Sequence, residues 1–454
     1  MSHDSINRAE APTLRRLGLT FAMLAGILAA AIAIAYFVQH HKPQVQTPQV
    51  LAAAMAKLDP VAGADPIARG RYLAAAGDCI GCHQARGGAP RSDEFSGGLA
   101  VPTPFGKIYT SNITPDRETG IGSWTADDFW RALHEGTGKN GKYLYPAFPY
   151  PNYTRITRVD ADALYAYLMS LPAVRRDNTP NQLRFPYGIR PLMVFWRALY
   201  FRQHVFQPDA HQDAQWNRGA YLASGLGHCV ACHSPRNFLG GTHEDDELSG
   251  GLIPGQNWYA PSLTSDAEAG LGKWSVDEVV QLLKHGVTSR YAVFGPMAEV
   301  VHDSTQYLEE GDLRAMAIYL KSLPPKASDD APPVKTTEAM RADLMERGAR
   351  VYLDRCLACH RESGEGVVRA YPALASNPGV IMNSTINAIR VVLNGGLPPG
   401  TTGNPRPYGM PPFAQQLSDE DIAAVLTYVR NSWGNRAPAG SPADVGRYRA
   451  VPVE

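Results

Sequence analysis

Apolar residues along the chain form two kinds of pattern. From Leu17 to Val38 they make one continuous run without a charge, long enough to cross the hydrocarbon core of a bilayer. Further along they recur every three or four residues, as at Leu164, Tyr167 and Leu168, which predicts amphipathic helices. Stretches rich in Pro and Gly separate these helices. We therefore expect short helices joined by long ordered loops.

Two long segments of the chain repeat one another. The sequence Arg-Gly-x-Tyr-Leu begins at Arg69 and again at Arg218, and each copy leads to Ser-Gly-Gly-Leu, a Gly-x-Gly-x-Trp turn and a final helical pattern. A third, shorter segment keeps Arg-Gly at Arg347 and the final helical pattern, but loses the Trp turn. The sequence therefore predicts three tandem units of one fold.

Local signals place the helices inside each unit. Ser or Thr stands three residues before Asp or Glu at the spacing of a capping box; the pairs are Thr125 with Asp128, Ser275 with Glu278, and Ser418 with Asp421. Gly70, Gly219 and Gly348 lie in the first helices, where glycine costs helix propensity. Close packing by the final helix would explain them. The tyrosines expected over these glycines are Tyr167, Tyr319 and Tyr428.

Charge and cysteine usage narrow the class of protein. The 43 basic and 43 acidic residues balance, so the chain carries no electrostatic footprint for nucleic acid. All six cysteines lie in Cys-x-x-Cys-His, and none is left for a structural disulfide. A single copy could also be a thioredoxin-like motif or half a zinc site. Three copies, each opening a similar unit, indicate three covalently bound haem c groups.

Covalent haem attachment needs two thiols two residues apart, with histidine next to the second thiol. The cysteines are Cys79, Cys82, Cys229, Cys232, Cys356 and Cys359, and the iron-binding histidines are His83, His233 and His360. A methionine thioether at the sixth position closes the site and raises the reduction potential. Met297 follows His233, and Met410 follows His360, each before the final helical pattern of its unit. Both stand beside Gly and Pro, so we expect them to be ligands, whereas Met316, inside a helix, fits core filler better.

Unit one departs from this pattern. Phe148 follows His83 at almost the same separation at which Met297 follows His233, and so occupies the matching place, but a phenyl ring has no donor atom for iron. The iron would then be five-coordinate or water-bound, or would recruit another side chain. The replacements considered are Met169, Met193 and His134, none of them well placed in the sequence. The sixth position at haem 1 stays open, and the five-coordinate or water-bound state is the leading expectation.

The N-terminus carries the signals for localisation. Arg8, Arg15 and Arg16 precede the apolar run, and the positive-inside tendency keeps them cytoplasmic while the rest is exported. A cleaved signal peptide is an alternative, with 33–35 as the cleavage site, but its apolar core is usually only about 7–15 residues long. A twin-arginine signal fits poorly, because c-type haem is attached after export of an unfolded chain. We expect an uncleaved anchor in the bacterial inner membrane and haem units in the periplasm.

The chain divides into nine segments. They are a cytoplasmic N-terminus (1–16), a transmembrane anchor (17–38), a tether (39–64), unit one (65–175), a connector (176–212), unit two (213–325), a Pro-rich linker (326–340), unit three (341–436) and a tail (437–454). Within the connector, residues 183–206 are aromatic and apolar with spaced arginines. Apolar runs are usually core, which favours a strap packed between units. A membrane-surface segment and a docking patch are the alternatives.

The motifs together resemble the triheme cytochrome c subunits of membrane-bound periplasmic dehydrogenases. The resemblance rests on DCIGCH, TSNITPD, YPAFPYPNYTR, GHCVACHSPRN, FGPMAEV, STQY, AMAIYLKSLPP and SWGNRAP, and covers nearly the whole chain after the tether. It implies a mostly α-helical protein of three tandem class I cytochrome c domains behind a transmembrane helix. It also implies a chain that is not itself an enzyme, but passes electrons from a catalytic subunit to ubiquinone.

The sequence around Phe148 resembles one branch of this family. Many members, notably those of the alcohol dehydrogenases, have YPAMPY where this chain has YPAFPY. The YPAFPY form is similar to members that accompany molybdenum and iron–sulfur enzymes. We therefore expect as partners a molybdopterin aldehyde dehydrogenase and an iron–sulfur subunit.

Other functions compete with this interpretation. The same chain could serve a PQQ alcohol dehydrogenase or a flavin gluconate or polyol dehydrogenase, or could be attached to a terminal oxidase. A haem peroxidase acting at an open haem 1 is an alternative of another class. Peroxidase chemistry needs polar acid–base groups over the open face. The loop around Phe148 supplies Tyr and Asn but no evident His or Glu, which argues against that role.

Overall fold

The computed structural model describes residues 23, 25–34, 49–84, 94–267, 270–326 and 337–451. The α-helices are α2 (Gln49–Leu58), α3 (Pro66–Ala76), α4 (Cys79–His83), α5 (Ala126–Glu135), α6 (Tyr150–Tyr153), α7 (Arg158–Ser170), α8 (Met193–Tyr200), α9 (Ala214–Tyr221), α10 (Val276–His285), α11 (Pro296–Asp303), α12 (Glu310–Ser322), α13 (Glu338–Arg355), α14 (Leu357–His360), α15 (Pro378–Ile381), α16 (Ile386–Asn394), α17 (Asp419–Arg430) and α18 (Pro442–Arg449). A π-helical segment (Leu222–Leu226) and 3-10 turns at Arg190–Leu192, Cys229–Ala231, Glu244–Asp246 and Thr305–Tyr307 complete the helical part. The expected helical class is confirmed.

Among the described residues, five short strands accompany the helices. They are β1 (Ala100–Thr103), β2 (Gly106–Tyr109), β3 (Gln182–Leu183), β4 (Gly251–Ile253) and β5 (Trp258–Ala260). β1, β2 and β3 form one antiparallel sheet in that order, in which Val101 pairs with Ile108 and Gly106 with Leu183. β4 and β5 form an antiparallel hairpin. β3 comes from the connector, so the sheet fastens the start of the connector to unit one.

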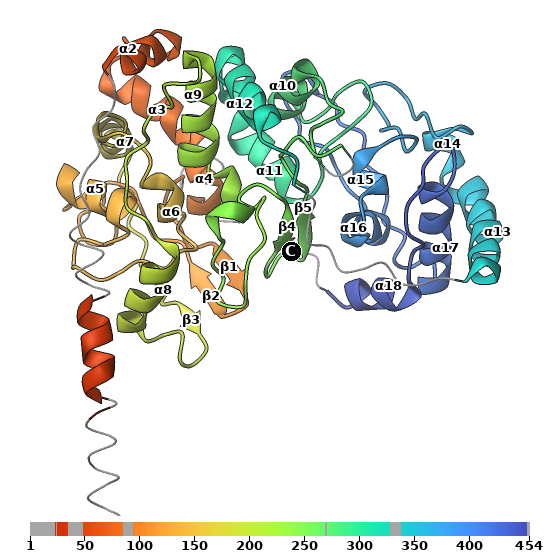
Figure 1. The fold of residues 1–454 in the computed structure, drawn as a ribbon, viewed down its shortest axis with the longest axis horizontal. Coiled ribbons are helices and arrows are strands. Elements are labelled where there is room, and N and C mark those ends of the chain that lie inside the picture. Colours follow the sequence, from red (N-terminus) through yellow and green to blue (C-terminus); the bar gives the residue numbers. More distant parts are fainter. Residues whose placement is uncertain are drawn as a thin grey trace, which may run out of the picture.

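In each unit the first helix crosses the last. α3 packs on α7, α9 on α12 and α13 on α17, and Figure 1 shows these pairs following one another across the molecule in chain order. A Cβ added to the glycine at each crossing would meet a backbone carbonyl oxygen: Ala163 at 2.0 Å from Gly70, Ala315 at 2.0 Å from Gly219, and Ala424 at 2.2 Å from Gly348. The predicted close approach is confirmed. Tyr167 and Tyr428 are among the nearest neighbours at the first and third crossings.

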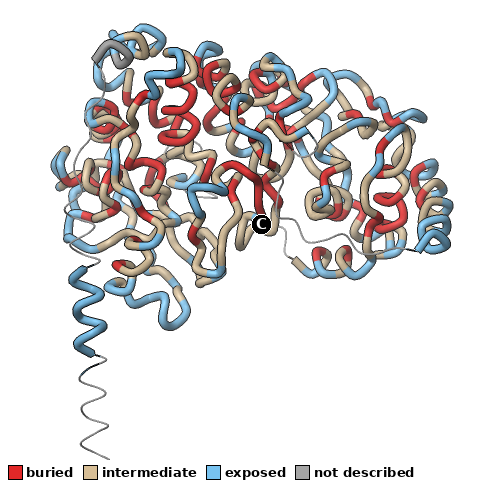
Figure 2. The backbone as a smooth tube through the Cα atoms, viewed as in Figure 1, coloured by how far each residue is buried: buried red, intermediate tan, exposed pale blue. Residues whose placement is uncertain are grey.

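The predicted helix starts are also confirmed. Reciprocal capping boxes form between Thr125 and Asp128, Ser275 and Glu278, and Ser418 and Asp421. They begin α5, α10 and α17. Figure 2 shows buried positions concentrated along the crossing helices and around β4 and β5. Local capping therefore sets where these helices begin, and burial decides which face turns inward.

A buried ionic network joins units one and two with approximate two-fold symmetry. Each arginine of Arg-Gly-x-Tyr-Leu binds the last helix of its own unit: Arg69 Nε donates to Asp160 at 2.9 Å, and Arg218 Nε donates to Asp312 at 2.8 Å. Each tyrosine of the same motif crosses to the other unit: Tyr72 donates to Asp312 at 2.6 Å, and Tyr221 donates to Asp160. Asp59 lies between the arginines, 2.7 Å from Arg69 and 3.3 Å from Arg218.

This network corrects the prediction of a tether at 39–64. Within that segment α2 packs against α9, and Asp59 follows directly at its end. The later part of the segment is therefore built into the junction of two units, while residues 39–48 lie outside the described residues. Two other boundaries also shift. α13 already begins at Glu338, inside the expected linker, and the tail forms α18, which packs on α16 and α17.

The expected anchor is described only in part. Met23 and residues 25–34 are helical and solvent-exposed. Residues 17–22, 24 and 35–38 lie outside the described residues, as does the N-terminus before them. Within the ranges that the structure describes, no helix combines the length and apolarity needed to cross a bilayer.

The connector combines two of the structures expected for it. Its second half packs as a strap: Val194 and Phe201 are buried, and Trp196 Nε1 donates to the carbonyl of Leu239 in unit two at 3.0 Å. Its first half, residues 184–192, remains largely at the surface, and the side chain of Phe185 is 88% exposed. The strap prediction is therefore right for α8 and wrong for the residues before it.

The helix crossings provide the first testable prediction. Gly70→Ala would place a methyl group 2.0 Å from a carbonyl oxygen, so α3 and α7 must separate, at a cost of about 1–3 kcal/mol in the free energy of unfolding. Gly311→Ala in α12 is the matched control, because nothing lies within 4 Å of its added Cβ. It should change stability by about 1 kcal/mol or less, in the stabilising direction. Guanidinium unfolding of the holoprotein measures both, and equal effects would refute the tight crossing.

Candidate haem sites

The second Cys-x-x-Cys-His motif holds its histidine in one defined state. This motif directly follows α9 and the π-helical segment, which pack against α12, the last helix of the unit. His233 Nδ1 donates to the carbonyl of Pro261 at 2.7 Å. A carbonyl only accepts, so the proton stays on Nδ1 and the lone pair of Nε2 is free. Burial also lowers the pKa of His233. A neutral imidazole oriented in this way is the form that ligates a metal.

The same arrangement recurs at the other two motifs. His83 Nδ1 donates to the carbonyl of Ser111 at 2.7 Å, and His360 Nδ1 donates to that of Pro372 at 3.1 Å. Burial lowers the pKa of both histidines. The three motif histidines therefore share one tautomer. In each case the acceptor that fixes the tautomer is a backbone carbonyl rather than a side chain.

The thiols in these motifs lie in surroundings that favour their protonated form. Burial raises the pKa of Cys79 and Cys229 to about 12 and that of Cys356 to about 11. Thioredoxin-like motifs and thiolate metal sites depend on lowered thiol pKa values. All six cysteines are free of disulfides. Paired thiols without a disulfide, each pair followed by an oriented histidine, are the arrangement that covalent haem attachment uses.

A cavity of about 490 Å³ runs through units two and three. Two sets of predicted haem-binding residues line it: Cys229, Cys232, His233 and Met297 from unit two, and Cys356, Cys359, His360 and Met410 from unit three. Most other lining side chains are apolar, including many Leu and Val residues. This volume is within the range of small-molecule and cofactor sites. Tertiary structure has thus brought two separately predicted ligand sets to one apolar space.

The two methionines occupy loops or helix ends at the cavity. Met297 lies in the first turn of α11, and Met410 pairs its backbone with Gly396 across an isolated bridge. Both are half-buried. Met316 also lines the cavity, but it is buried where α12 crosses α9, with its backbone nitrogen 3.0 Å from the Cβ position of Gly219. Its packing agrees with the expected core role.

In unit one, Phe148 stands two residues before α6. It is half-buried, and its ring centroid is 5.4 Å from that of Tyr153. The Tyr153 hydroxyl donates to the carbonyl of Gly77 at 3.0 Å, directly before the first motif. The Cys79 thiol adds to the effect of burial in raising the pKa of Tyr153. The loop that carries Phe148 therefore reaches the first motif through Tyr153.

The replacements considered for a sixth ligand have other roles. His134 is 2% exposed, stacks on Trp130 with a centroid distance of 4.3 Å, and donates from Nδ1 to the carbonyl of Thr154 at 2.8 Å. Met169 packs against the core of unit one from within α7, and Met193 begins α8 in the connector. His134 therefore has a structural role, and the sixth position at haem 1 stays a prediction.

The first and second motifs lie against each other. α11, which carries Met297, packs on α4 of unit one, and α6 of unit one packs on the π-helical segment before the second motif. Asp78, next to Cys79, lines the cavity of units two and three. Burial raises the pKa of Cys232, Arg236 offsets part of the rise, and the Asp78 carboxyl adds to it. The second motif therefore borders the first and shares a cavity with the third.

Comparison of the sequence with known proteins identifies the family of this chain. The cytochrome c family profile matches residues 67–172 and 345–433. The cytochrome c subunit of gluconate 2-dehydrogenase from Pantoea cypripedii is 40% identical over 386 residues, covering 82% of this chain and 87% of that protein. The cytochrome c subunit of alcohol dehydrogenase (quinone) from Gluconobacter oxydans is 40% identical over 397 residues, covering 85% and 82%. The chain belongs to the family of dehydrogenase cytochrome c subunits.

A third relative of this cytochrome subunit is longer. One of the subunits of nicotinate dehydrogenase from Pseudomonas putida is 39% identical over 457 residues, which cover 97% of this chain and 36% of that protein. Its sequence therefore contains a region similar to nearly the whole of this chain within a larger polypeptide. The three relatives belong to three types of dehydrogenase and have nearly equal identity to this chain.

Membership of this cytochrome family implies covalently bound haem c, and the residues fit that group. Paired thiols and a histidine with free Nε2 are present at all three motifs, and an apolar cavity adjoins the second and third. The motifs alone did not reveal the carbonyl acceptors at Ser111, Pro261 and Pro372. A signal was present: Ser111 and Pro261 each lie 28 residues after the histidine, in the matching stretches YTSNIT and YAPSLT.

Proposed function

We propose that this chain is a membrane-anchored triheme electron-transfer subunit that takes electrons from a periplasmic dehydrogenase and passes them to ubiquinone. The observation that carries the proposal is the threefold recurrence of a Cys-x-x-Cys-His motif whose histidine Nδ1 is held by a backbone carbonyl. The covalent attachments would be Cys79, Cys82, Cys229, Cys232, Cys356 and Cys359, with His83, His233, His360, Met297 and Met410 on iron. Haem c supplies one-electron redox chemistry at each site.

The contacts between motifs support transfer along the chain of sites. Site two borders site one through Asp78 and shares an apolar cavity with site three. The protein contributes by fixing the imidazoles and by excluding water, so that little rearranges when charge changes. We therefore place the second site between the other two in the path.

The proposed catalytic partner is a molybdopterin aldehyde dehydrogenase with an iron–sulfur subunit. Its support is the resemblance of YPAFPY, around Phe148, to the branch that accompanies such enzymes. The relatives named above are subunits of gluconate, alcohol and nicotinate dehydrogenases, which makes these classes the competing partners.

The proposed location is the inner membrane, with the haem units in the periplasm. Its support is the uncharged run at 17–38 behind three arginines, together with the helical, solvent-exposed state of residues 25–34. Ubiquinone as acceptor follows from the resemblance to membrane-bound dehydrogenases.

Methionine substitutions test the ligand assignments. Met297→Ala and Met410→Ala should each open one iron and lower its reduction potential, by a fraction of the roughly 0.8 V range that axial ligands control. Met316→Leu is the matched control, because this buried side chain lines the same cavity without a proposed bond to iron. Spectroelectrochemical titration of the holoprotein measures the potentials. If a methionine variant and the control behave alike, that ligand assignment is wrong.

Phe148 generates a separate prediction. The reduced protein should bind carbon monoxide at one haem of three, because a phenyl ring leaves the sixth position without a donor. Phe148→Met should remove that binding and raise the potential of haem 1. Carbon monoxide difference spectra provide the measurement. Three low-spin six-coordinate irons in the natural protein would rule out the open site and require another ligand.

Purification of the intact complex tests the partner. Detergent-solubilised membranes should yield this chain together with molybdenum, iron–sulfur signals and an aldehyde-oxidising activity that reduces a ubiquinone analogue. Recovery with PQQ or flavin instead would assign one of the other dehydrogenase classes. Copper with haem a or b would place the chain with an oxidase and overturn the proposal.

A further inference from the structure

One face of the molecule combines exposed aromatic side chains with arginines. Phe185 is 88% exposed and Phe238 is 86% exposed, while Tyr187 and Leu192 are also solvent-accessible. Arg184 and Arg202 are exposed nearby in the connector. We call these six residues the basic aromatic face. Exposed large apolar side chains that gather in this way mark an interaction surface.

Contacts between three loops give this face a defined shape. Tyr187 packs on Phe105 with a ring-centroid distance of 4.6 Å. An added Cβ at Gly240 would lie 3.0 Å from the Phe105 ring, so the loop that carries Phe238 adjoins the same aromatic side chain. The hydrogen bond from Trp196 to the carbonyl of Leu239 ties that loop to α8. Phe185 and Phe238 are therefore exposed side chains in loops whose neighbouring residues are packed against the body of the protein.

The six residues of this face include two arginines and no carboxylate, and the carboxylates closest to it in the sequence lie beyond its edge, where Glu244 and Glu247 interact electrostatically with His204. Residues 178–208 contain four arginines and no Asp or Glu, and Arg197 is the buried one of the four. The flanking stretches 101–115 and 234–243 also lack carboxylates, and the exposed Lys107 lies in the first of them. Aromatic and apolar side chains beside Arg and Lys, in stretches that contain no carboxylate of their own, suit the interface of a bilayer that contains anionic lipids.

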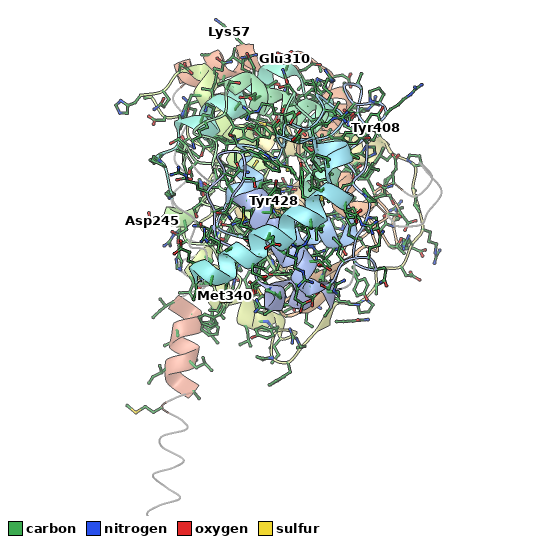
Figure 3. The ribbon with its side chains drawn as sticks, turned by 90° about the vertical axis from the view of Figure 1, so that its right-hand side faces the viewer. Lys57, Asp245, Glu310, Met340, Tyr408 and Tyr428 are labelled. Atoms are coloured by element: carbon green, nitrogen blue, oxygen red, sulfur yellow. The ribbon has the colours of Figure 1, made fainter. Side chains whose placement is uncertain are left out.

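The position of the face agrees with such a partner. Figure 1 shows the helix at 25–34 leaving the body on the side where β3 and α8 lie. Figure 3 shows Lys57 and Glu310 at the opposite end of the molecule. Residues 35–48 separate the helix from α2. A chain that is fully extended advances by roughly 3.3–3.6 Å with each residue, so this connection is long enough for α2 to lie far from the bilayer.

We propose that the basic aromatic face rests on the bilayer, with Phe185 and Phe238 inserted at the level of the lipid headgroups and the arginines paired with lipid phosphates. This inference rests on the proposed membrane location. It adds a second attachment, which would hold units one and two at a fixed orientation rather than let them swing on the anchor.

Site-directed spin labelling of the holoprotein can test this contact. All six natural cysteines lie in haem motifs, so an added cysteine is the only thiol left for a nitroxide. Four variants are needed: Phe185→Cys and Phe238→Cys on the face, Leu58→Cys as an apolar control beside Lys57 at the far end, and Ile27→Cys in the anchor. Each is reconstituted in nanodiscs containing phosphatidylglycerol, and collisions with oxygen and with a water-soluble nickel complex are compared.

The expected result is loss of nickel collisions and gain of oxygen collisions at positions 185, 238 and 27, but not at 58. If position 27 is protected while 185 and 238 stay in water, the face does not touch lipid and this inference fails alone. If position 27 also stays in water, the proposed membrane location fails. Protection of 185 and 238 only after addition of the catalytic subunit would identify the face as a protein interface instead.

A charge variant provides a second test. Arg184→Gln with Arg202→Gln should weaken protection at position 238 and reduce its dependence on phosphatidylglycerol. Lys57→Gln, at the opposite end, is the matched control and should have no effect. Haem absorbance establishes that each variant is folded and loaded. Equal protection in neutral and anionic nanodiscs, unchanged by the double substitution, would exclude a role for the arginines.

Discussion

The tight crossing of the first and last helices determines the rest of each unit. It is possible only because glycine stands at the contact, where a carbonyl oxygen from the other helix occupies the space that a Cβ would need. The first helix leads directly into the Cys-x-x-Cys-His segment, so the crossing positions that segment. The last helix of each unit follows the segments that hold the carbonyl acceptor and the residue predicted for the sixth position. One glycine per unit therefore helps to position the Cys-x-x-Cys-His segment, because its lack of a side chain permits the close crossing.

The Arg-Gly-x-Tyr-Leu motif forms bonds both within its own unit and across the junction between units. Its arginine binds the last helix of its own unit, and its tyrosine reaches the aspartate of the neighbouring unit. Two copies of the motif thereby build a paired arrangement, with Asp59 between the two arginines. Unit three keeps the arginine pair, Arg347 with Asp421 at 2.8 Å, but has no tyrosine at the matching position. It joins unit two differently, through Asn387, whose side chain binds the backbone of Tyr259.

The haem sites separate features that depend on residues nearby in the sequence from features that depend on distant ones. The motifs, the caps and the helices of the repeats depend on neighbours within a few residues, so the pattern alone predicted them, whereas α2 and α18 lie in segments that were expected to be a tether and a tail. The carbonyls that orient the histidines come from loops 28 and 12 residues away. They are backbone atoms, which side-chain identity does not reveal. The connector was only half predicted for a related reason. Aromatic residues pack or stay in water according to whether another loop covers them, and α8 is covered whereas residues 184–192 are not.

The sequence by itself determined the helical class, the three Cys-x-x-Cys-His motifs, the position of Phe148 where its sister unit has Met297, and the glycines over which the helices cross. Tertiary structure alone decided that sites two and three open into one cavity, that the segment before unit one belongs to the junction with unit two, and that an aromatic, basic face is left uncovered. The physical reason is the separation along the chain between the residues that interact. Haem attachment and capping act between residues a few positions apart, whereas cavities, junctions and exposed faces depend on surfaces that meet only when distant segments pack.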